Sequence, residues 1–325
     1  MKRITRVFAA AATALLTLAA SGSAQAQKAW PTKPVRIVVP FAIGGSTAAV
    51  ASLLAERLSK LWGMEVVVDP RGGGNTVIGT DLVAKSAPDG YTLLLTSNSH
   101  VIIPQLIATT FDPIKDFAPV GELSVSELIL LVNPSVPANN LAEFLALAKA
   151  RPGQVNYASA GTSSATHMAA EQLAQLAGVK LQHIPYKGSG PAITDLLGGQ
   201  VQASFQVPII GNPFVKSGKL RALAVTGDKR LAATPDVPTF AEAGLPGLNA
   251  ATWFGVLAPA GTPQAVVDKV SQDMERVLAQ PEFRQRLADL GMDPLEGGPA
   301  KFEQLIKTTM TNAGKVIKSA DIKLE

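Results

Sequence analysis

The stretch "IVVPFAIGGST" (residues 37–47) places a run of residues typical of a buried strand directly before two glycines, a serine and a threonine. An alanine-rich segment follows, in which Val50, Leu54 and Leu58 recur at helix spacing. The stretch therefore predicts a strand, a short glycine turn and a helix, which is how a βαβ unit begins. In open α/β sheets, ligands bind at turns of this kind.

Short apolar runs rich in Val, Ile and Leu alternate with helical patterns along the rest of the chain. These runs are continuous rather than alternating, as expected for strands covered on both faces of a mostly parallel sheet. The sequence thus predicts an α/β fold with helices flanking the sheets. The expected strands span residues 35–41, 65–70, 91–97, 128–133, 154–160, 203–208, 220–226 and 254–259.

The same local arrangement occurs a second time, in "YASAGTSSAT" (residues 157–166), where a strand runs into a loop of small residues and then a helix. Each half of the chain is therefore expected to carry one such loop at its own sheet edge, and two lobes that face each other would enclose a cleft. By length, a chain of 325 residues also suggests two domains.

Both loops have the composition of a small-anion site. The first turn of a helix presents N–H groups without intrahelical partners, glycines allow a ligand to approach the backbone, and hydroxyls add donors. Phosphate or carboxylate would suit such a site. The alternative is that these residues are ordinary helix caps without a ligand. The candidate residues are Gly44, Gly45, Ser46 and Thr47 in the first loop, and Gly161, Thr162, Ser163, Ser164 and Thr166 in the second.

Nucleotide and phosphate motifs are not complete in this sequence. Neither loop has the G-x-x-x-x-G-K-[ST] pattern of a P-loop. The segment "RGGGNTVIG" (residues 71–79) is followed by no lysine and by no acidic residue at the distance required for a ribose. Carboxylates held at each end by one loop explain both loops without a metal or a cofactor, and we predict neither.

The sequence offers little for catalysis. It contains three histidines and no cysteine, and no G-x-S-x-G nucleophile elbow occurs. His167 and Glu171 share a helix face, but without a H-E-x-x-H motif they predict no metal site. We therefore predict no catalytic residue. Lys187, in a Gly/Pro-rich loop with Tyr186, could reach an anion or could simply be solvated.

The N-terminus reads as a secretory signal peptide over residues 1–26. Three basic residues precede an apolar run, and small residues precede the expected cleavage site near Ala26–Gln27. A retained anchor is the alternative, although the run is short for a membrane span. Without a cysteine, no lipid anchor is expected. Removing the signal leaves 26 of the 29 Lys and Arg against 25 Asp and Glu, so neither nucleic acid nor an anionic membrane is an expected partner.

Several segments together resemble the tripartite tricarboxylate transporter substrate-binding proteins, also called Bug-type periplasmic receptors. The resemblance covers essentially the whole chain after the signal. The segments that carry it are "PTKPVRIVVPFAIGGST", "GYTLLL", "LLVNPSVPA", "VNYASAG", "IPYKGSGPAITDLLGGQV", "GKLRALAVT", "PDVPTFAEAGLPG" and "WFGVLAPAGTP".

This resemblance implies a monomeric periplasmic solute-binding protein with a two-lobed, type II-like α/β fold. Such a protein captures an organic carboxylate in the cleft between its lobes and delivers it to the permease subunits of a tripartite transporter. The expected first lobe comprises residues 27–126 and 227–325, and the second residues 127–226. The chain would cross between them near 128–133 and 220–226.

The resemblance also implies the ligand-binding positions of this chain. One loop runs from Phe41 to Thr47 and includes Ile43, and the other runs from Gly161 to Thr166, closed by His167. Further positions, in a cleft-lining loop and at the ends of two strands, are Ser97, Ser99, Tyr186, Lys187, Gly188, Gln206 and Val207.

Two positions depart from the family pattern. Many members have an aspartate where this chain has Ala48, and another where it has Gln206. An acidic residue there could pair with the amine of an amino acid, so its loss favours a ligand that bears only carboxylates. We therefore expect a dicarboxylate. Apolar neighbours such as Ile43, Val207 and Pro208 would suit an aromatic spacer, or they could simply pack.

Two other functions stay open at this point. The protein could present its ligand to a receptor kinase as a sensory partner. A secreted hydrolase of carboxylate esters is the other alternative, which the missing nucleophile elbow disfavours.

Overall fold

The computed structural model describes residues 30–248, 250–319 and 322 of the chain. The contacts of the chain divide it into two units, residues 1–32 and 33–325, and all the helices and strands named below belong to the second unit. The predicted signal peptide, residues 1–26, lies outside the described residues.

One sheet of the described chain has six strands in the order β11-β4-β10-β3-β1-β2. Strand β1 pairs in parallel with β2 and β3, whereas β10 runs antiparallel to β3 and β4, and β11 antiparallel to β4. The strands are β1 (Val35–Val39), β2 (Val66–Pro70), β3 (Thr92–Ser97), β4 (Phe117–Glu127), β10 (Ala251–Pro259) and β11 (Asp293–Pro294).

A second sheet in the described residues has five strands in the order β7-β6-β8-β5-β9. Here β6 pairs in parallel with β7 and β8, while β5 runs antiparallel to β8 and β9. Both sheets are thus mixed, and the loops of interest follow strands in their parallel parts. The strands are β5 (Ile129–Val132), β6 (Asn156–Ser159), β7 (Gln182–Pro185), β8 (Ala203–Gln206) and β9 (Arg221–Val225).

Helices flank both sheets, as the alternating sequence pattern predicts. Alongside the five-stranded sheet lie α5 (Leu141–Ala150), α6 (Ala165–Ala177), α7 (Ser189–Leu197) and α8 (Pro208–Lys216). The chain of the six-stranded sheet contains α2 (Ser46–Trp62), α3 (Val77–Ala84), α4 (Ser99–Ile102), α9 (Gln264–Leu278), α10 (Pro281–Asp289), α11 (Pro299–Ser319) and the 3₁₀ turns η1 (Gly74–Thr76) and η2 (Ile103–Gln105). No helix among the described residues is long and apolar enough to cross a membrane.

The strand–loop–helix unit of the sequence forms twice, as β1–α2 and as β6–α6. Each helix ends at a glycine in the left-handed conformation, Gly63 with φ 60° and Gly178 with φ 61°. Glycine adopts this conformation without the steric cost that a Cβ atom would add, so it ends the helix cleanly. In each of these two units, a helix therefore begins just after the carboxyl end of a parallel strand.

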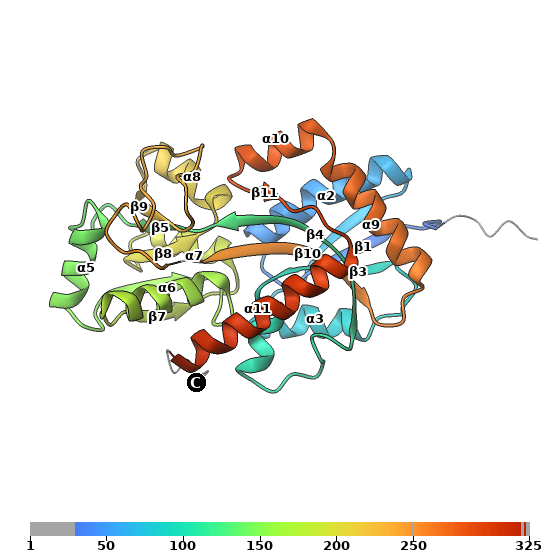
Figure 1. Cartoon of the computed structure of the whole chain (residues 1–325), viewed down its shortest axis with the longest axis horizontal. Coiled ribbons are helices and arrows are strands. Elements are labelled where there is room, and N and C mark those ends of the chain that lie inside the picture. The colour runs from blue at the N-terminus through green and yellow to red at the C-terminus, as the bar shows by residue number, and fades with distance from the viewer. Residues whose placement is uncertain (1–29, 249, 320–321, 323–325) are drawn as a thin grey trace, which may run out of the picture. The chain divides into compact units, whose positions relative to one another are not determined.

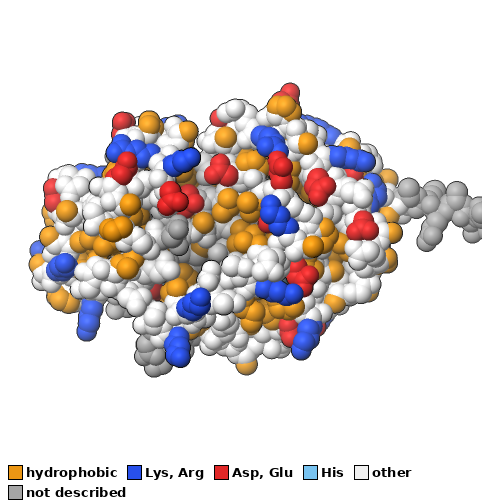
Figure 2. Space-filling model, viewed as in Figure 1, with side chains coloured by type: hydrophobic (Ala, Val, Ile, Leu, Met, Phe, Trp, Pro, Cys, Tyr) orange, Lys and Arg blue, Asp and Glu red, His pale blue; other side chains and the backbone are white. Residues whose placement is uncertain are grey.

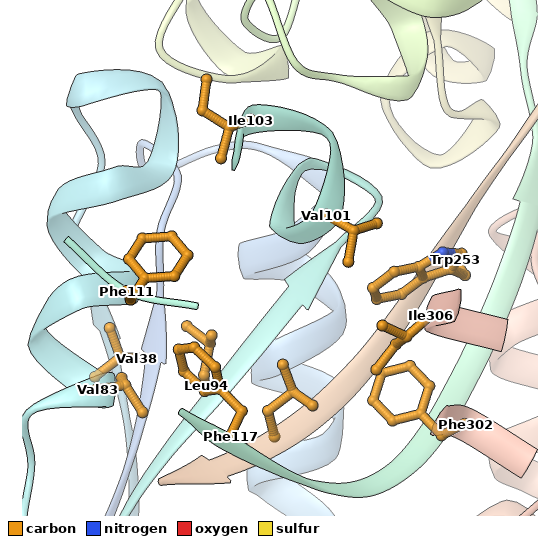
Figure 3. Packing of buried hydrophobic residues seen from close by; sticks show 11 residues of the cluster. Val38, Val83, Leu94, Val101, Ile103, Phe111, Phe117, Trp253, Phe302 and Ile306 are labelled. Atoms are coloured by element: carbon orange, nitrogen blue, oxygen red, sulfur yellow. The ribbon is translucent and has the colours of Figure 1, made fainter. Parts of the chain in front are cut away.

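One part of the core of the six-stranded sheet lies between its strands and helices α3, α4 and α11 (Figure 3). The rings of Trp253 on β10 and Phe302 on α11 meet edge to face, with centroids 5.3 Å apart. Ile306, one helical turn beyond Phe302, packs in the same cluster. This contact attaches the long α11 to the sheet, so that α11 crosses in front of β4 and β10 in Figure 1.

The chain passes between the two sheets twice. Strand β4 leads into β5 through Leu128 alone, and β9 leads to β10 through residues 226–250. At this crossing the backbone N–H of Leu128 donates to Thr226 Oγ1, and the N–H of Thr226 donates to the Leu128 carbonyl, each at 2.8 Å. The two connections are thereby tied together where they pass between the sheets.

Candidate ligand-binding site

A small cavity of ≈30 Å³ lies where loops of the two sheets meet. This ligand cavity has room for one or two water molecules. It contains predicted residues from both loops and from the strands that precede the loops. Its wall is formed by Phe41, Gly45, Ser46, Thr47, Ser97, Ala160, Ser164, Ala165, Thr166, Ser189, Val207, Thr252 and Phe254.

Three helix N-termini meet at the ligand cavity. The first residues of α2, α6 and α7, namely Ser46, Ala165 and Ser189, all lie on its wall. First-turn N–H groups lack partners within their own helix and carry a partial positive charge. Because three such ends surround one small space, the site offers several backbone donors to an anion.

In the first loop the hydroxyls are free to act as donors. The N-cap of α2 is Gly45, which provides no side-chain cap. Ser46 and Thr47 are 7% and 4% exposed. Neither hydroxyl makes a hydrogen bond within the part of the chain that the structure describes. A ligand in the cavity could therefore accept hydrogen bonds from both.

In the second loop, by contrast, the hydroxyls are largely used within the loop. Ser164 is the N-cap of α6 and accepts a hydrogen bond from the His167 N–H at 3.2 Å. Its own Oγ lies 2.7 Å from the Gly161 carbonyl oxygen. Thr166 Oγ1 accepts from the Ala160 N–H at 3.0 Å. Helix capping, the alternative to a ligand contact, is thus the observed role of Ser164.

The wall of the ligand cavity carries no charged side chain among the described residues. An anion there would be held by backbone N–H groups and hydroxyls alone, and no carboxylate is present to pair with an amine. Phe41, Val207 and Phe254 supply an apolar part of the wall. No group of three or more metal-ligating residues occurs within the described ranges.

The two loops are joined by a backbone hydrogen bond. The N–H of Ala42, after β1, donates to the carbonyl oxygen of Lys187, after β7, at 2.9 Å. The contact depends on a close backbone approach at the start of α7. A Cβ atom on Gly190 would lie 2.9 Å from the Ile43 carbonyl oxygen. Only glycine fits at this position without displacing the first loop.

Several predicted residues lie off the cavity wall. Ile43 is 79% exposed at the tip of the first loop. Gln206 is fully buried, and its amide donates to Ser204 Oγ at 2.7 Å, which directs it along its own sheet. Tyr186 donates to Asp195 Oδ2 at 2.6 Å and, partly buried, packs against the core of the five-stranded sheet. Lys187 contributes its carbonyl oxygen rather than its ammonium group. The other predicted residues outside the wall are Gly44, Ser99, Gly161, Thr162, Ser163, His167 and Gly188.

His167 supports the second loop from behind. Its Nδ1–H donates to the Thr162 carbonyl oxygen, and its ring stacks on that of His183 with centroids 4.0 Å apart. His183 in turn stacks on Tyr157 at 4.9 Å. Burial and, to a smaller extent, the neighbouring His167 lower the pKa of His183 to about 3. Burial also lowers the pKa of His167. Two stacked rings of this kind are stable when both are neutral.

Four wall residues, Ala160, Ser189, Thr252 and Phe254, lie outside the predicted positions, and Ala165 lies within the predicted loop Gly161–Thr166 but was not singled out. Ser189 is the second residue after Lys187 and begins α7. Thr252 and Phe254 alternate along β10, so both face the cavity. These two residues could have been found from the strand pattern, but the sequence predicts that this strand begins at residue 254, whereas β10 begins at residue 251. Ala160 and Ala165 have no functional group that a pattern could have revealed.

Comparison with known proteins assigns the chain to a family. Residues 50–322 match the family model described as tripartite tricarboxylate transporter family receptor. The solved periplasmic binding protein BugD has a TM-score of 0.87 and 35% identity, covering 91% of this chain and 100% of that chain.

Two further solved structures hold ligands. An R. palustris protein with adipate has a TM-score of 0.88 and 33% identity, covering 90% of this chain and 99% of that one. MatC from Rhodopseudomonas palustris, with bound malate, has a TM-score of 0.84 and 32% identity, covering 89% and 100%. This chain has the two-lobed fold of the periplasmic binding proteins and belongs to the Bug-type tripartite tricarboxylate transporter receptor family.

Proposed function

We propose that this protein is a periplasmic solute-binding protein that captures a small dicarboxylate and delivers it to a tripartite tricarboxylate-type permease. The observation that carries the proposal is the meeting of three helix N-termini at a cavity whose wall is uncharged. Backbone donors and hydroxyls can hold a carboxylate at such a site without a counter-charge. It needs neither a cofactor nor a metal, and no catalytic residue is proposed.

The absence of an acidic side chain from the described wall supports a dicarboxylate over an amino acid. A buried ammonium group without a carboxylate partner would be strongly disfavoured. Adipate and malate, the ligands of two solved relatives, are both dicarboxylates. The rings of Phe41 and Phe254 on the wall suit an apolar spacer, which includes an aromatic one.

Ligand capture in this proposal is coupled to closure of the cleft. The ligand cavity is small, and the loops on its two sides are joined by the bond from Ala42 to Lys187. Because a cavity of this size holds only one or two water molecules, a dicarboxylate reaches the site when this bond is open, and the loops then close on the ligand around a wider space than the one seen here. The closed form is the one that a permease would recognise. The predicted signal peptide is consistent with action in the periplasm.

The experiment is a thermal-shift screen of the mature protein followed by calorimetry. The panel contains adipate, malate, succinate and terephthalate, with matched monocarboxylates and amino acids. We expect a dicarboxylate to raise the melting temperature, since a ligand at a hundredfold excess over its dissociation constant stabilises by about 2.7 kcal/mol. Stabilisation by amino acids alone would contradict the proposal.

A matched pair of variants separates the ligand cavity from the rest of the surface. Ser46→Ala removes a hydroxyl from the wall, and Ser135→Ala removes one from a turn of the five-stranded sheet, outside the wall. We expect Ser46→Ala to weaken the identified dicarboxylate by about tenfold, the value of one hydrogen bond to a charged group. Equal affinities of the two variants would mean that Ser46 does not contact the ligand.

A further inference from the structure

A second and much larger cavity lies beside α11, on the other face of β10 from the ligand cavity. This α11 cavity has a volume of ≈550 Å³, which is within the range of small-molecule sites. Met168, Trp253, Leu305 and Val316 make much of its wall apolar. On the face shown in Figure 2, hydrophobic side chains gather between β11 and α11.

One buried acceptor atom on this wall has neither a hydrogen-bond partner nor an ion-pair partner among the described residues. It is Oε1 of Gln172 on α6, which lines the α11 cavity. Buried polar atoms without partners are uncommon in folded proteins and costly, so this oxygen points to a missing donor. Glu122, a side chain on β4 that is 3% exposed, lines the same wall.

The charge at this wall is already balanced. Lys301 Nζ lies 3.3 Å from Glu122 Oε1 and forms an ion pair with it. The same ammonium group also donates to the Glu296 carbonyl oxygen. A further full charge in an otherwise apolar cavity would lack a counter-charge and be disfavoured. The wall of the α11 cavity therefore favours an uncharged ligand that carries a hydrogen-bond donor.

The α11 cavity and the ligand cavity share structural elements. On β10, Thr252 and Phe254 face the ligand cavity, whereas Ala251 and Trp253 face the α11 cavity. This division follows from the period of two along a strand. At the start of α6, Ala165 lines both cavities. The α11 cavity is thus formed by helices from both sheets, α6 and α11, on the opposite side of β10.

We propose that the α11 cavity is a second binding site, which takes an uncharged and largely apolar molecule carrying a hydroxyl or N–H donor. The apolar body packs against Trp253 and Met168. Its donor satisfies Gln172 Oε1. The site is separate from the carboxylate site, because its wall lies on the other face of β10.

The test uses 2-naphthol as the probe and 2-methoxynaphthalene as its counterpart without a donor. Calorimetry on the mature protein is expected to show one-to-one binding of 2-naphthol. The methyl ether is expected to bind about tenfold more weakly, the equivalent of one hydrogen bond. In Gln172→Met, which keeps the length of the side chain but removes an acceptor, this difference is expected to shrink.

Two exposed threonines of α11 provide the matched variants. Thr308 lies on the cavity wall and Thr311 does not. Thr308→Trp, which fills the cavity, is expected to weaken 2-naphthol at least about tenfold, while Thr311→Trp retains wild-type affinity. Equal affinity in both variants, or no binding to the wild type, overturns the proposal. Because both substitutions lie outside the ligand cavity, a failure here leaves the carboxylate proposal untouched.

Discussion

The backbone N–H of Ala42 and the carbonyl oxygen of Lys187 form a hydrogen bond of 2.9 Å that joins the loop after β1 to the loop after β7. One loop belongs to the six-stranded sheet and the other to the five-stranded sheet. In the proposed function, this bond marks the closed form of the cleft. Its geometry depends on the small residues around it, which can be tested by adding single methyl groups.

Gly190→Ala is expected to weaken dicarboxylate binding by about tenfold, because overpacking costs about 1–3 kcal/mol and its new Cβ would meet the Ile43 carbonyl oxygen at 2.9 Å. The control is Gly198→Ala at the end of the same helix, where the nearest atom would be 3.6 Å away. Calorimetry with the best dicarboxylate measures both. A Gly190→Ala protein with wild-type affinity would contradict a role for this close approach in closure.

Thr166→Val is expected to reduce stability, whereas Thr47→Val is expected to reduce ligand affinity. Thr166 Oγ1 accepts from the Ala160 N–H, so its loss leaves a donor unpaired and lowers the free energy of unfolding by about 1–3 kcal/mol. Thr47, with a free hydroxyl, is expected to lose affinity about tenfold while its stability changes by about 0.5 kcal/mol or less. Urea unfolding and calorimetry on both variants check this. The reverse pattern would assign the ligand contact to Thr166.

Ala48→Asp is expected to weaken the dicarboxylate by at least about tenfold. Ala48 is a buried residue in the first turn of α2, so a carboxylate there would repel an anion bound at the helix N-terminus. Ala48→Asn has the same shape without the charge and is expected to retain more affinity. If the two variants bind equally, the absence of an acidic residue at position 48 does not determine the preference for a dianion.

Stability is expected to fall as the pH is lowered from about 6.5 towards 3. Burial lowers the pKa of His183 to about 3 and that of His100 to about 4, while histidines in the unfolded chain titrate near 6.5. Between these values the unfolded chain binds more protons than the folded one, so acid favours unfolding.

His183→Phe keeps an aromatic ring in the stack and removes this titration. The slope of the free energy of unfolding against pH is expected to decrease by up to about 1.4 kcal/mol per pH unit between about pH 6 and 4. Urea titrations at a series of pH values measure it. Parallel curves for the variant and the wild type would show that His183 does not contribute to the acid sensitivity.

The sequence predicted the strands that are continuously apolar, and it missed those that are interrupted. β4 contains Pro119, Gly121 and the buried Glu122, so its eleven residues do not read as a strand, although it pairs along its length with β10. β7, "QHIP", is short and partly exposed at the edge of its sheet. Apolar pattern alone also does not distinguish parallel from antiparallel pairing, because β10 is buried on both faces in either case.

At the site, the sequence identified the loops better than the roles of their side chains. The sequence could not show that the Ser164 hydroxyl caps its helix whereas the Ser46 hydroxyl is free. That difference depends on which residue becomes the N-cap, which is Ser164 in α6 but Gly45 in α2. Gln206 was selected by resemblance, but its amide turns back to Ser204. Ser189 lies on the wall because α7 begins at this residue. Helix propensity predicts the first residue of a helix only to within a residue or two.

The bond between Ala42 and Lys187 consists only of main-chain atoms, whereas the wall of the ligand cavity is largely made of side chains. Exchanging a serine, threonine or valine of the wall can therefore change which ligand is bound without altering the hydrogen bond that joins the loops. A permease that recognises the closed form would accept any ligand around which the loops can close. Selectivity of capture and recognition by the transporter can then diverge independently within one scaffold.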